Sequence, residues 1–529
     1  MKGYIDNIED LTKGNDDFRR VLYTGQNLQL VLMAIQPGED IGAEVHEDHD
    51  QFFRVDEGRG ERPALRMRDR DISYAELQRL CNRAGNALRQ AGVEPEQRVA
   101  IVLPDGAEFV GTFIGAMKIG AVPVPMNTFG RAEDLAFMLR HSRARVVVIE
   151  ESLLKLVGDA APARMFVVHE AQEEPLYGAA SPDLDTYPTG VDEPCYWLYS
   201  SGTTGRPKAV VHLQGDMLAC VTPYAEEVVA ITPDDRVFSV PRLFFSYGLV
   251  NSLFLPLLAG ASAVLTPQRP DAGHVLDMVC EFRPTLFFSV PSSIAQLCSA
   301  LAERADRPFE SLRFAISAGE PLPQPLYARW KALTGVEILD GLGSTEVGYI
   351  FCSNLPGRVR PGSSGLMLGD HQARIVDGEL WVHAASTALH YWNLRDRSRQ
   401  TFVGEWLRTG DRYRQDAEGY LWYEGRMDDV FKVNGQWVSP LEVESCLLEH
   451  PSVLECAVVA ALDDAGLTKP KAFVVARSGA DVSASELQAL VRERLQAYKF
   501  PRWIEFVDEL PKTGTGKVQR FRLRQSLRA

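Results

Sequence analysis

Apolar strands and amphipathic helices alternate along most of the chain, from about residue 61 to residue 425. Residues 98–103, 146–149 and 286–289 are short apolar runs typical of buried strands. Residues 74–92 instead repeat apolar side chains at helical spacing and stop at a glycine. Parallel strands need long crossovers, usually helices, so this alternation places helices on the faces of mainly parallel sheets. The pattern therefore predicts an α/β fold of stacked layers.

A second, smaller unit follows a boundary predicted at residues 425–428. Beyond it we expect a helix, two strands, a helix and a strand, at residues 440–449, 455–460, 472–476, 484–496 and 504–507. This order predicts an α+β domain of about 100 residues, a normal domain size. We therefore divide the chain into a fragment at residues 1–60, a large domain at 61–425 and a small C-terminal domain at 426–529.

Composition limits the class of protein. The chain has 529 residues, 45% of them apolar and 24% charged, which is the balance of an ordinary globular protein. Its net charge of −15 favours solubility and argues against nucleic acid as a partner. We see neither a transmembrane run nor a signal peptide, and the eight cysteines are scattered without a C-x-x-C pair. These features predict a cytoplasmic protein with reduced thiols and no membrane partner; a homodimer is left open.

The sequence pattern of residues 1–60 differs from that of the rest of the chain. Short strand-like runs precede a segment that resembles the first motif of small cupins, in which Glu44, His46 and Gln51 would be the candidate metal ligands. The second cupin motif is absent, and a half barrel can neither close its sheet nor complete a metal shell. A β-rich appendage without metal is therefore the favoured interpretation of this cupin-like fragment.

A glycine- and hydroxyl-rich loop stands between residues 199 and 208, with the sequence YSSGTTGRPK. Backbone N–H groups and hydroxyls in such a loop can surround a polyphosphate, and Lys208 would supply the counter-charge. The spacing does not fit the Walker A pattern. Taken alone, the segment is more often a plain surface loop.

Four further motifs lie downstream. The segment 340–346 (DGLGSTE) ends in a hydroxyl and a carboxylate, and a carboxylate beside phosphates commonly holds Mg²⁺. Asp411 offers an acceptor suited to ribose hydroxyls, Arg426 precedes the small domain, and Lys517 sits on a glycine-rich segment near the C-terminus. Taken alone, each motif is more often an acidic turn, a β-turn, an interdomain ion pair or a solvated loop lysine, respectively.

In this order and spacing, the five motifs resemble the acyl-adenylate-forming superfamily, which includes acyl-CoA synthetases, peptide-synthetase adenylation domains and firefly luciferase. The resemblance runs from about Glu61 to Leu527, and within the superfamily it is closest to benzoate–CoA ligases. The segments that carry it are residues 199–212, 243–249, 317–320, 340–346, 391–393 and 432–444.

The resemblance implies a two-step reaction with ATP, Mg²⁺ and coenzyme A. A small carboxylate would attack the α-phosphate of ATP, and a thiol would then displace AMP after the small, mobile domain has rotated. The implied catalytic residues are Lys517 on the carboxylate and α-phosphate, Glu346 on the metal, Thr345 on the α-phosphate and Thr203 on the pyrophosphate. Asp428 would be the hinge. The residues implied to bind nucleotide or coenzyme are Ser200, Ser201, Gly202, Thr204, Gly205, Lys208, Gly319, Glu320, Asp340, Gly343, Ser344, Asp411, Arg426, Lys432, Asn434 and Gly435.

An aromatic segment matches the wall of the family's acyl pocket. Phe245, Ser246 and Tyr247 would suit a flat, apolar acid, such as an aromatic or cyclic carboxylate. Tyr349 stands where benzoate–CoA ligases usually carry histidine, so its phenol would reshape the pocket or donate a different hydrogen bond. Plain core packing is the alternative for each of these residues.

Two other functions are alternatives to an acid–CoA ligase. In the first, a carrier-protein thiol replaces coenzyme A as the acceptor. In the second, the chain is a metal-binding, cupin-like sensor attached to an inert scaffold. The presence of Lys517, Glu346 and Asp411 together argues against the sensor.

Overall fold

The computed structural model describes residues 60–160, 162, 164–169, 176–200, 206–304, 306–477, 479–512 and 518–527, and the backbone of two N-terminal strands. These strands, β1 (Arg20–Thr24) and β2 (Gln29–Leu32), pair antiparallel, and contacts divide the chain into one unit at Met1–Arg59 and another at Gly60–Ala529. The cupin-like motif, with Glu44, His46 and Gln51, lies outside the described residues, as do Ser201–Gly205 of the glycine-rich loop and Lys517.

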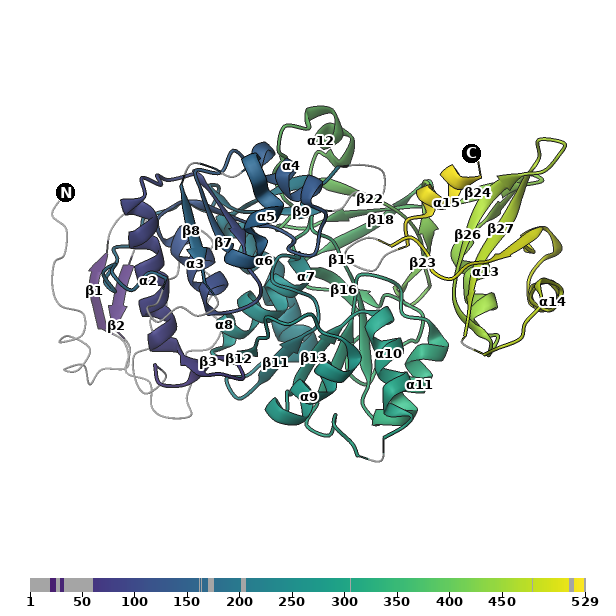
Figure 1. Ribbon diagram of the computed structural model, residues 1–529, viewed down its shortest axis with the longest axis horizontal. Helices are drawn as coiled ribbons and strands as arrows, with labels where there is room; N and C mark the ends of the chain where they lie inside the picture. Colours follow the sequence, from purple (N-terminus) through teal and green to yellow (C-terminus); the bar gives the residue numbers. More distant parts are fainter. Residues whose placement is uncertain are drawn as a thin grey trace. The chain divides into compact units, whose positions relative to one another are not determined.

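The larger unit is built on a nine-stranded sheet whose six central strands are parallel (Figure 1). In spatial order its strands are β17 (Leu366–Met367), β16 (Ile350–Ser353), β15 (Ile338–Gly343), β14 (Phe314–Ser317), β13 (Leu286–Ser289), β11 (Arg236–Ser239), β12 (Ser262–Val264), β3 (Pro63–Arg66) and β4 (Asp71–Ser73). The strand predicted at residues 286–289 is confirmed as β13, which pairs with β14 in this sheet.

Helices cover both faces of this sheet because successive side chains of a strand point in opposite directions. On β13, Phe287 packs toward Trp330, whereas Leu286 and Phe288 belong to the core on the other face. The helices on the first face, which lie together in Figure 1, are α9 (Ala272–Phe282), α10 (Pro291–Leu301) and α11 (Gln324–Thr334). Those that contribute to the other core include α2 (Tyr74–Gln90), α3 (Ala107–Lys118), α6 (Gln214–Tyr224) and the π-helical turn η4 (Val250–Phe254).

Local sequence explains where the first of these helices begins and how closely it packs. Ser73 caps α2: its Oγ accepts from the backbone N–H of Glu76, and the Glu76 carboxylate accepts from the backbone N–H of Ser73. On α3, a Cβ at Gly115 would lie 2.6 Å from the carbonyl oxygen of Cys81. The glycine therefore lets α2 and α3 approach closely.

Smaller sheets complete the described part of the chain. A parallel sheet contains β6 (Val122–Pro125), β5 (Arg98–Val102), β7 (Val146–Glu150) and β8 (Met165–Val168). A second contains β20 (His390–Tyr391), β10 (Lys208–Leu213) and β9 (Pro194–Ser200). A third contains β18 (Gln372–Val376), β19 (Glu379–His383), β22 (Trp406–Gln415) and β21 (Phe402–Val403), with β23 (Leu421–Arg426) paired to β22. The other short helices are α4 (Ala132–Ser142), α5 (Leu154–Val157), α7 (Ser246–Leu249), α8 (Leu255–Ala259) and α12 (Arg395–Thr401).

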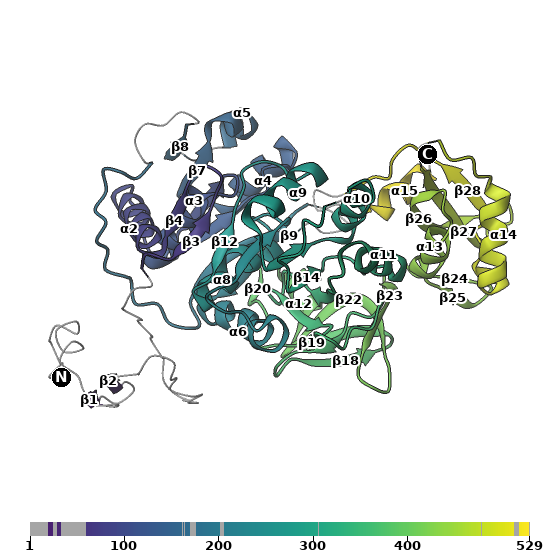
Figure 2. The same cartoon turned by 90° about the horizontal axis from the view of Figure 1, so that it is seen from below.

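The C-terminal part has its own sheet and its own core (Figure 2). Its elements are β24 (Phe431–Val433), β25 (Gln436–Val438), α13 (Pro440–Leu448), β26 (Val453–Leu462), β27 (Thr468–Ala476), α14 (Ala484–Arg494), β28 (Trp503–Phe506) and α15 (Arg520–Ser526). From α13 to β28 this is the order of elements expected from the sequence, whereas the β24–β25 hairpin and α15 were not expected. The mixed α/β fold class is confirmed. The boundary at residues 425 and 426 stays a proposal; strand β23 ends at Arg426.

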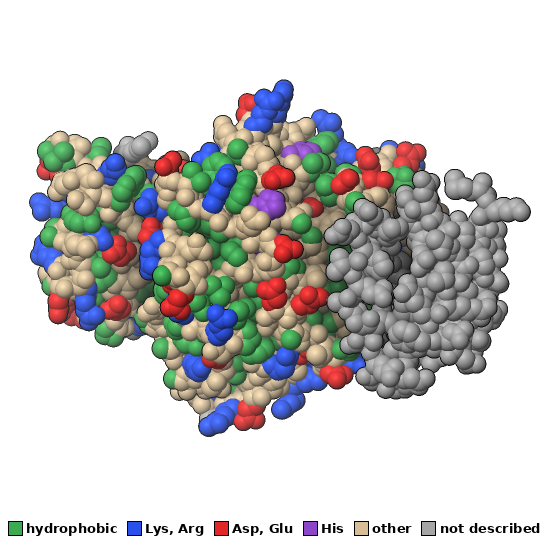
Figure 3. Space-filling view, turned by 180° about the vertical axis from the view of Figure 1, so that it is seen from behind, with side chains coloured by type: hydrophobic (Ala, Val, Ile, Leu, Met, Phe, Trp, Pro, Cys, Tyr) green, Lys and Arg blue, Asp and Glu red, His purple; other side chains and the backbone are tan. Residues whose placement is uncertain are grey.

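The surface and the helices bear on the predicted partners. On the face that Figure 3 shows, Lys and Arg side chains are interspersed with Asp, Glu and hydrophobic side chains. None of the described helices combines the length and apolar character needed to cross a bilayer. The predicted absence of nucleic acid, the cytoplasmic location and the homodimer stay predictions.

Candidate functional site

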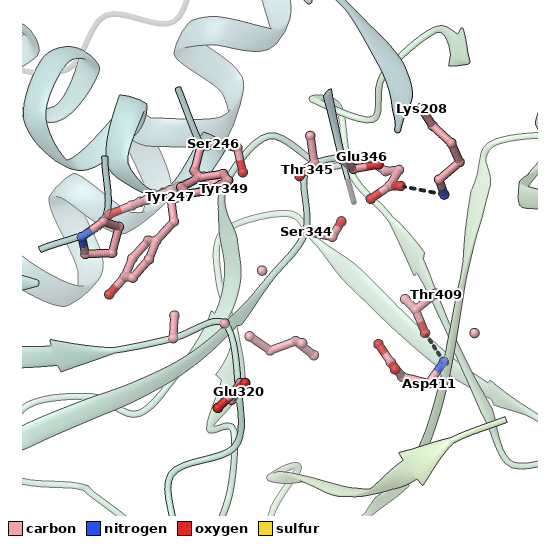
Figure 4. Close-up of a pocket in the computed structure, with 18 of the residues that line it drawn as sticks. Lys208, Ser246, Tyr247, Glu320, Ser344, Thr345, Glu346, Tyr349, Thr409 and Asp411 are labelled. Atoms are coloured by element: carbon pink, nitrogen blue, oxygen red, sulfur yellow. Dashed lines mark hydrogen bonds and ion pairs between the residues drawn. The ribbon is translucent and has the colours of Figure 1, made fainter. Parts of the chain in front are cut away.

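A cavity of about 970 Å³ opens at the carboxyl ends of the parallel strands of the large sheet. Residues that follow β11, β13, β14 and β15 all line it, among them Ser246, Ser292, Glu320 and Glu346. Open parallel sheets usually bind ligands at this edge. Figure 4 shows Ser246, Tyr247 and Tyr349 at one end, Lys208 and Glu346 at another, and Thr409 with Asp411 at a third.

One end of the cavity carries the described flanks of the glycine-rich loop. Ser200 closes β9 and pairs in register with Lys208, which opens β10, so the two described flanks lie side by side on antiparallel strands. Ser200 Oγ is buried without a hydrogen-bond partner among the described residues. A buried hydroxyl without a partner is costly unless a ligand satisfies it, so this end fits an oxygen-rich group such as a phosphate.

Lys208, Glu346 and Tyr391 form a compact polar cluster beside that loop. Lys208 Nζ lies 3.7 Å from Glu346 Oε1, and the Tyr391 hydroxyl donates to the same oxygen at 2.7 Å. Lys208 Nζ also lies 3.3 Å from the Tyr391 hydroxyl. Burial lowers the pKa of Lys208, and the nearby carboxylate partly offsets this shift. The cluster therefore places the Lys208 ammonium and the Glu346 carboxylate side by side on a part-buried wall of the cavity.

Glu346 is suited to a magnesium ion that is held mainly by phosphates. Its Oε1 takes both contacts just described, and its Oε2 has no hydrogen-bond partner in the described part of the chain. No group of three or more metal-binding side chains occurs among the described residues. Mg²⁺ does not require such a cluster of protein ligands, because it is commonly bound by one or two carboxylates, water and substrate phosphates.

A buried histidine holds the backbone at Thr345 from behind. The imidazole of His212 lies with Nε2 2.7 Å from the carbonyl oxygen of Thr345 and Nδ1 3.0 Å from Asp216 Oδ2. A carbonyl only accepts, so Nε2 must carry a proton. His212 and Asp216 are both buried, and 133 residues of sequence separate His212 from Thr345. It therefore fixes the turn that presents Thr345 and Glu346.

A second ion pair forms a further wall of the cavity. Arg426 Nη1 donates to Asp411 Oδ1 at 2.9 Å and to the carbonyl oxygen of Thr409 at 3.1 Å. The Thr409 hydroxyl accepts from the backbone N–H of Asp411 at 3.1 Å and donates to the carbonyl of Leu380 at 2.7 Å. Burial opposes the charge of Arg426, but the combined effect of Asp411, Tyr423 and Asp428 is larger, so the pKa of Arg426 is raised. A carboxylate fixed in this way is suited to accept from sugar hydroxyls.

The third end of the cavity is aromatic. Phe245 precedes the short helix α7, which begins with Ser246 and Tyr247, while Tyr349 comes from the turn before β16. The rings of Tyr247 and Tyr349 lie 6.4 Å apart, and Tyr349 is 2% exposed. The Tyr349 hydroxyl donates to Asn251 Oδ1 at 2.6 Å. These residues make a flat-sided, largely dry pocket.

Some of the residues expected at the site lie elsewhere. Asp340 does not line the cavity; it is buried, and its Oδ2 accepts from the backbone N–H of Leu322 at 3.3 Å. Lys432, Asn434 and Gly435 lie on the exposed hairpin of β24 and β25, away from the lining. The expected residues that the cavity does bring together are Ser200, Lys208, Phe245, Ser246, Tyr247, Gly319, Glu320, Gly343, Ser344, Thr345, Glu346, Tyr349, Asp411, Arg426 and Asp428.

Gly343 is explained by packing as well as by the site. A Cβ at this position would lie 2.6 Å from the carbonyl oxygen of Tyr349. The glycine therefore permits β15 and β16 to come together just before the turn that carries Glu346. Sequence reasoning gave no role to Tyr391, His212 or Asn251, although Tyr391 and His212 fall within segments that it singled out.

The buried carboxyl of Asp340 leads to a prediction about stability and pH. Burial raises the pKa of Asp340 to about 8, whereas an exposed aspartate ionises near pH 4. Between these values the unfolded chain releases a proton that the folded chain keeps, so the free energy of unfolding falls as the pH rises. The fall is at most about 1.4 kcal/mol per pH unit. Asp340→Asn removes the ionisation, so its Tm relative to the unsubstituted protein should rise from pH 5 to pH 8.

Thermal unfolding of the full chain at both pH values measures this effect. Asp192→Asn serves as the control, because Asp192 is exposed and its substitution should not change the pH slope. Parallel pH slopes for Asp340→Asn and the unsubstituted protein would contradict the prediction.

Comparisons with known proteins show the family of the chain. The AMP-binding enzyme family matches residues 52–392, and the AMP-binding enzyme C-terminal domain matches residues 442–517. The chain is 42% identical to benzoate–CoA ligase of Thauera aromatica, over 86% of this chain and 90% of that protein. It is 41% identical to 4-hydroxybenzoate–CoA/benzoate–CoA ligase of Rhodopseudomonas palustris, over 89% of this chain and 92% of that protein.

A solved structure has a similar fold over most of the chain. An anthranilate CoA ligase in complex with anthranoyl-AMP superimposes with a TM-score of 0.83 and 38% identity, over 89% of this chain and 95% of that chain.

Proposed function

The chain belongs to the AMP-binding enzyme family, and from this premise we propose that it is an ATP-dependent ligase that joins an aromatic carboxylic acid to coenzyme A. The observation that carries the proposal is the single cavity in which an anion-binding end, a sugar-binding wall and an aromatic pocket meet. An acid, an ATP molecule and a thiol must be brought together for such a reaction, and this cavity has a suitable surface for each of the first two.

The reaction runs in two steps. A carboxylate oxygen of the acid attacks the α-phosphorus of ATP, the bond to the β-phosphate oxygen breaks, and acyl-AMP and pyrophosphate result. The sulfur of coenzyme A then attacks the acyl carbon, AMP leaves, and the thiol proton is lost. Nucleotidyl transfer depends mainly on positioning and on neutralising developing charge, so the residues around the phosphates matter most.

The cavity suggests a role for each wall. Lys208 and the glycine-rich loop, with Thr203 on the leaving pyrophosphate, would neutralise the phosphates. Thr345, held by His212, would contact the α-phosphate. Glu346 would hold Mg²⁺, which supplies charge neutralisation on the phosphate oxygens. Asp411, aligned by Arg426, would accept from the ribose hydroxyls.

The small domain would complete the site. Lys517 would contact the carboxylate and the α-phosphate in the first step, and Asp428, which lines the cavity, would act as the hinge. Asn434 and Gly435, on the exposed hairpin, would reach the thiol path only after rotation. Asn434 and Gly435 have φ values of 51° and 80°, which suit a tight two-residue turn.

An acid panel scored with and without coenzyme A tests the proposal. With coenzyme A, benzoate-type or cyclic acids should give the highest kcat/KM, and aroyl-CoA should be found by mass. One misplaced methylene costs about 1–3 kcal/mol in an apolar pocket, so several small acids should react. Without coenzyme A, pyrophosphate release should stop after about one turnover, because acyl-AMP stays bound.

Two results would contradict it. Highest kcat/KM for long-chain fatty acids would exclude an aromatic acid as substrate. Pyrophosphate release that coenzyme A does not stimulate would point to another acceptor, such as a carrier-protein thiol.

A further inference from the structure

A row of buried hydrogen bonds lies behind the aromatic wall of the cavity. Tyr349 Oη lies 2.6 Å from Asn251 Oδ1, and Asn251 Nδ2 lies 3.1 Å from Ser239 Oγ. Ser239 Oγ in turn lies 3.1 Å from the carbonyl oxygen of Pro241. Asn251 is fully buried on the π-helical turn η4, and Ser239 is 7% exposed, so little water reaches the row.

The chemistry of the last acceptor fixes the direction of the whole row. A backbone carbonyl only accepts, so the Ser239 hydroxyl must give its proton to Pro241. Ser239 Oγ then accepts from Asn251 Nδ2, which turns Asn251 Oδ1 toward the phenol. The reversed amide would set Asn251 Oδ1 against a hydroxyl oxygen whose proton is already used, and two buried acceptors in contact are unfavourable. Tyr349 therefore gives its one hydroxyl proton to Asn251.

This direction determines what Tyr349 can offer a ligand. Tyr349 lines the cavity, and within the described residues its Oη makes no hydrogen bond other than that to Asn251. Burial raises the pKa of Tyr349 well above its usual value, so the phenol stays neutral. Its remaining hydrogen-bonding capacity is that of an acceptor.

We propose that this enzyme selects aromatic carboxylates whose ring bears a hydrogen-bond donor, a hydroxyl or an amino group, with Tyr349 Oη as the acceptor and Asn251 as the residue that positions it. The proposal rests on the function proposed above and narrows its substrate class. A hydroxybenzoate or an aminobenzoate can donate to Tyr349, whereas a methyl group of similar size cannot. Leaving one buried group unpaired costs enough to separate such a pair of acids by about tenfold or more in kcat/KM.

Tyr247 provides a matched comparison in the same pocket. Its Oη lies 3.5 Å from the carbonyl oxygen of Ile316, at the far limit of a hydrogen bond, and its ring lies 6.4 Å from that of Tyr349. Tyr247→Phe and Tyr349→Phe each remove one phenol oxygen from the pocket. The Asn251 side chain also acts on the Tyr247 phenol through a hydrogen bond, but only Tyr349→Phe removes the oxygen proposed to accept from the ligand.

The test is the ratio of kcat/KM for a hydroxybenzoate to that for the methylbenzoate substituted at the same carbon, measured at the ortho, meta and para positions by aroyl-CoA formation. We expect a ratio of about ten or more at one position at least. In Tyr349→Phe the ratio at that position should fall toward one, and in Tyr247→Phe it should persist, even if absolute rates fall in both.

Asn251→Ala adds a readout that a structural role alone would not move. This variant keeps the Tyr349 phenol but removes the acceptor of its proton, so the phenol can donate to a ligand. The hydroxybenzoate-to-methylbenzoate ratio of kcat/KM should therefore fall. The ratio of kcat/KM for a methoxybenzoate, which can only accept, to that for the methylbenzoate should rise. If Asn251→Ala does not fold, the two phenylalanine variants still decide the question.

Three results would overturn the inference. These are ratios near one at all three positions in the unsubstituted enzyme, a ratio that persists in Tyr349→Phe, or an unchanged methoxy-to-methyl ratio in folded Asn251→Ala. Each leaves the proposed function intact as long as aroyl-CoA forms. Failure to form aroyl-CoA from any aromatic acid would instead remove the proposed function itself.

Discussion

Replacing Lys517 with alanine is expected to lower acyl-AMP formation by about 10²-fold or more, while thioester formation from supplied acyl-AMP continues at a similar rate. The reason is that the ammonium group would neutralise charge that develops on the carboxylate and α-phosphate oxygens only in the first step. Loss of one such donor typically costs this much. Pyrophosphate release measures the first half-reaction, and single-turnover transfer from acyl-AMP to coenzyme A measures the second.

Lys512 is the control for this substitution. It lies just before the same glycine-rich segment, but its Nζ is paired with Glu455 Oε1 at 2.7 Å. Lys512→Ala should therefore change neither half-reaction by more than a few-fold. Equal losses in both half-reactions for Lys517→Ala would show that Lys517 supports the fold of the small domain or the binding of both reactants, and would refute the assignment.

The fold was largely predictable because its signals are local. Buried strands such as β5 and β13 are short apolar runs, and capped amphipathic helices such as α2 and α14 carry their own start signals. The prediction of an α/β adenylate-forming enzyme is confirmed by the family match and by the shared structure. Which strands are neighbours is not a local property: β12 pairs with β3, about 200 residues earlier in the chain.

The cupin-like interpretation of residues 1–60 and the assigned roles of the site residues stay predictions. The motifs did place many residues at one cavity, since the residues of a short motif stay close together in space. Lys208, Thr345 and Asp411 are examples.

The supporting residues could not be found from sequence. His212 reaches Thr345 across 133 residues, and Asn251 reaches Tyr349 across 98. No spacing rule connects such pairs, because their contact depends on how the sheet and helices pack. Asp340 is a different case: its motif position suggested a ligand contact, whereas in the structure its buried carboxyl accepts from a backbone N–H.

The second large effect is expected at Glu346. Glu346→Gln should keep the shape of the side chain and an acceptor for the Tyr391 hydroxyl, but it removes the negative charge that would hold Mg²⁺ and that now faces Lys208. We expect acyl-AMP formation to fall by about 10²-fold or more, because charge neutralisation at the phosphates is the main contribution of this wall. The Mg²⁺ concentration that gives half the maximal rate should rise, and excess Mg²⁺ should recover part of the loss.

Tyr391→Phe separates the metal from the surrounding cluster. It removes the 2.7 Å hydrogen bond to Glu346 but leaves the carboxylate and its ion pair with Lys208 in place. The loss of one hydrogen bond to a charged group should cost about tenfold in rate, with little change in the Mg²⁺ requirement. If Glu346 served only to keep Lys208 charged and in place, Glu346→Gln would lower the rate without changing the Mg²⁺ dependence, and excess Mg²⁺ would recover nothing. A shifted Mg²⁺ dependence in Glu346→Gln but not in Tyr391→Phe is therefore the result that assigns the metal to this carboxylate.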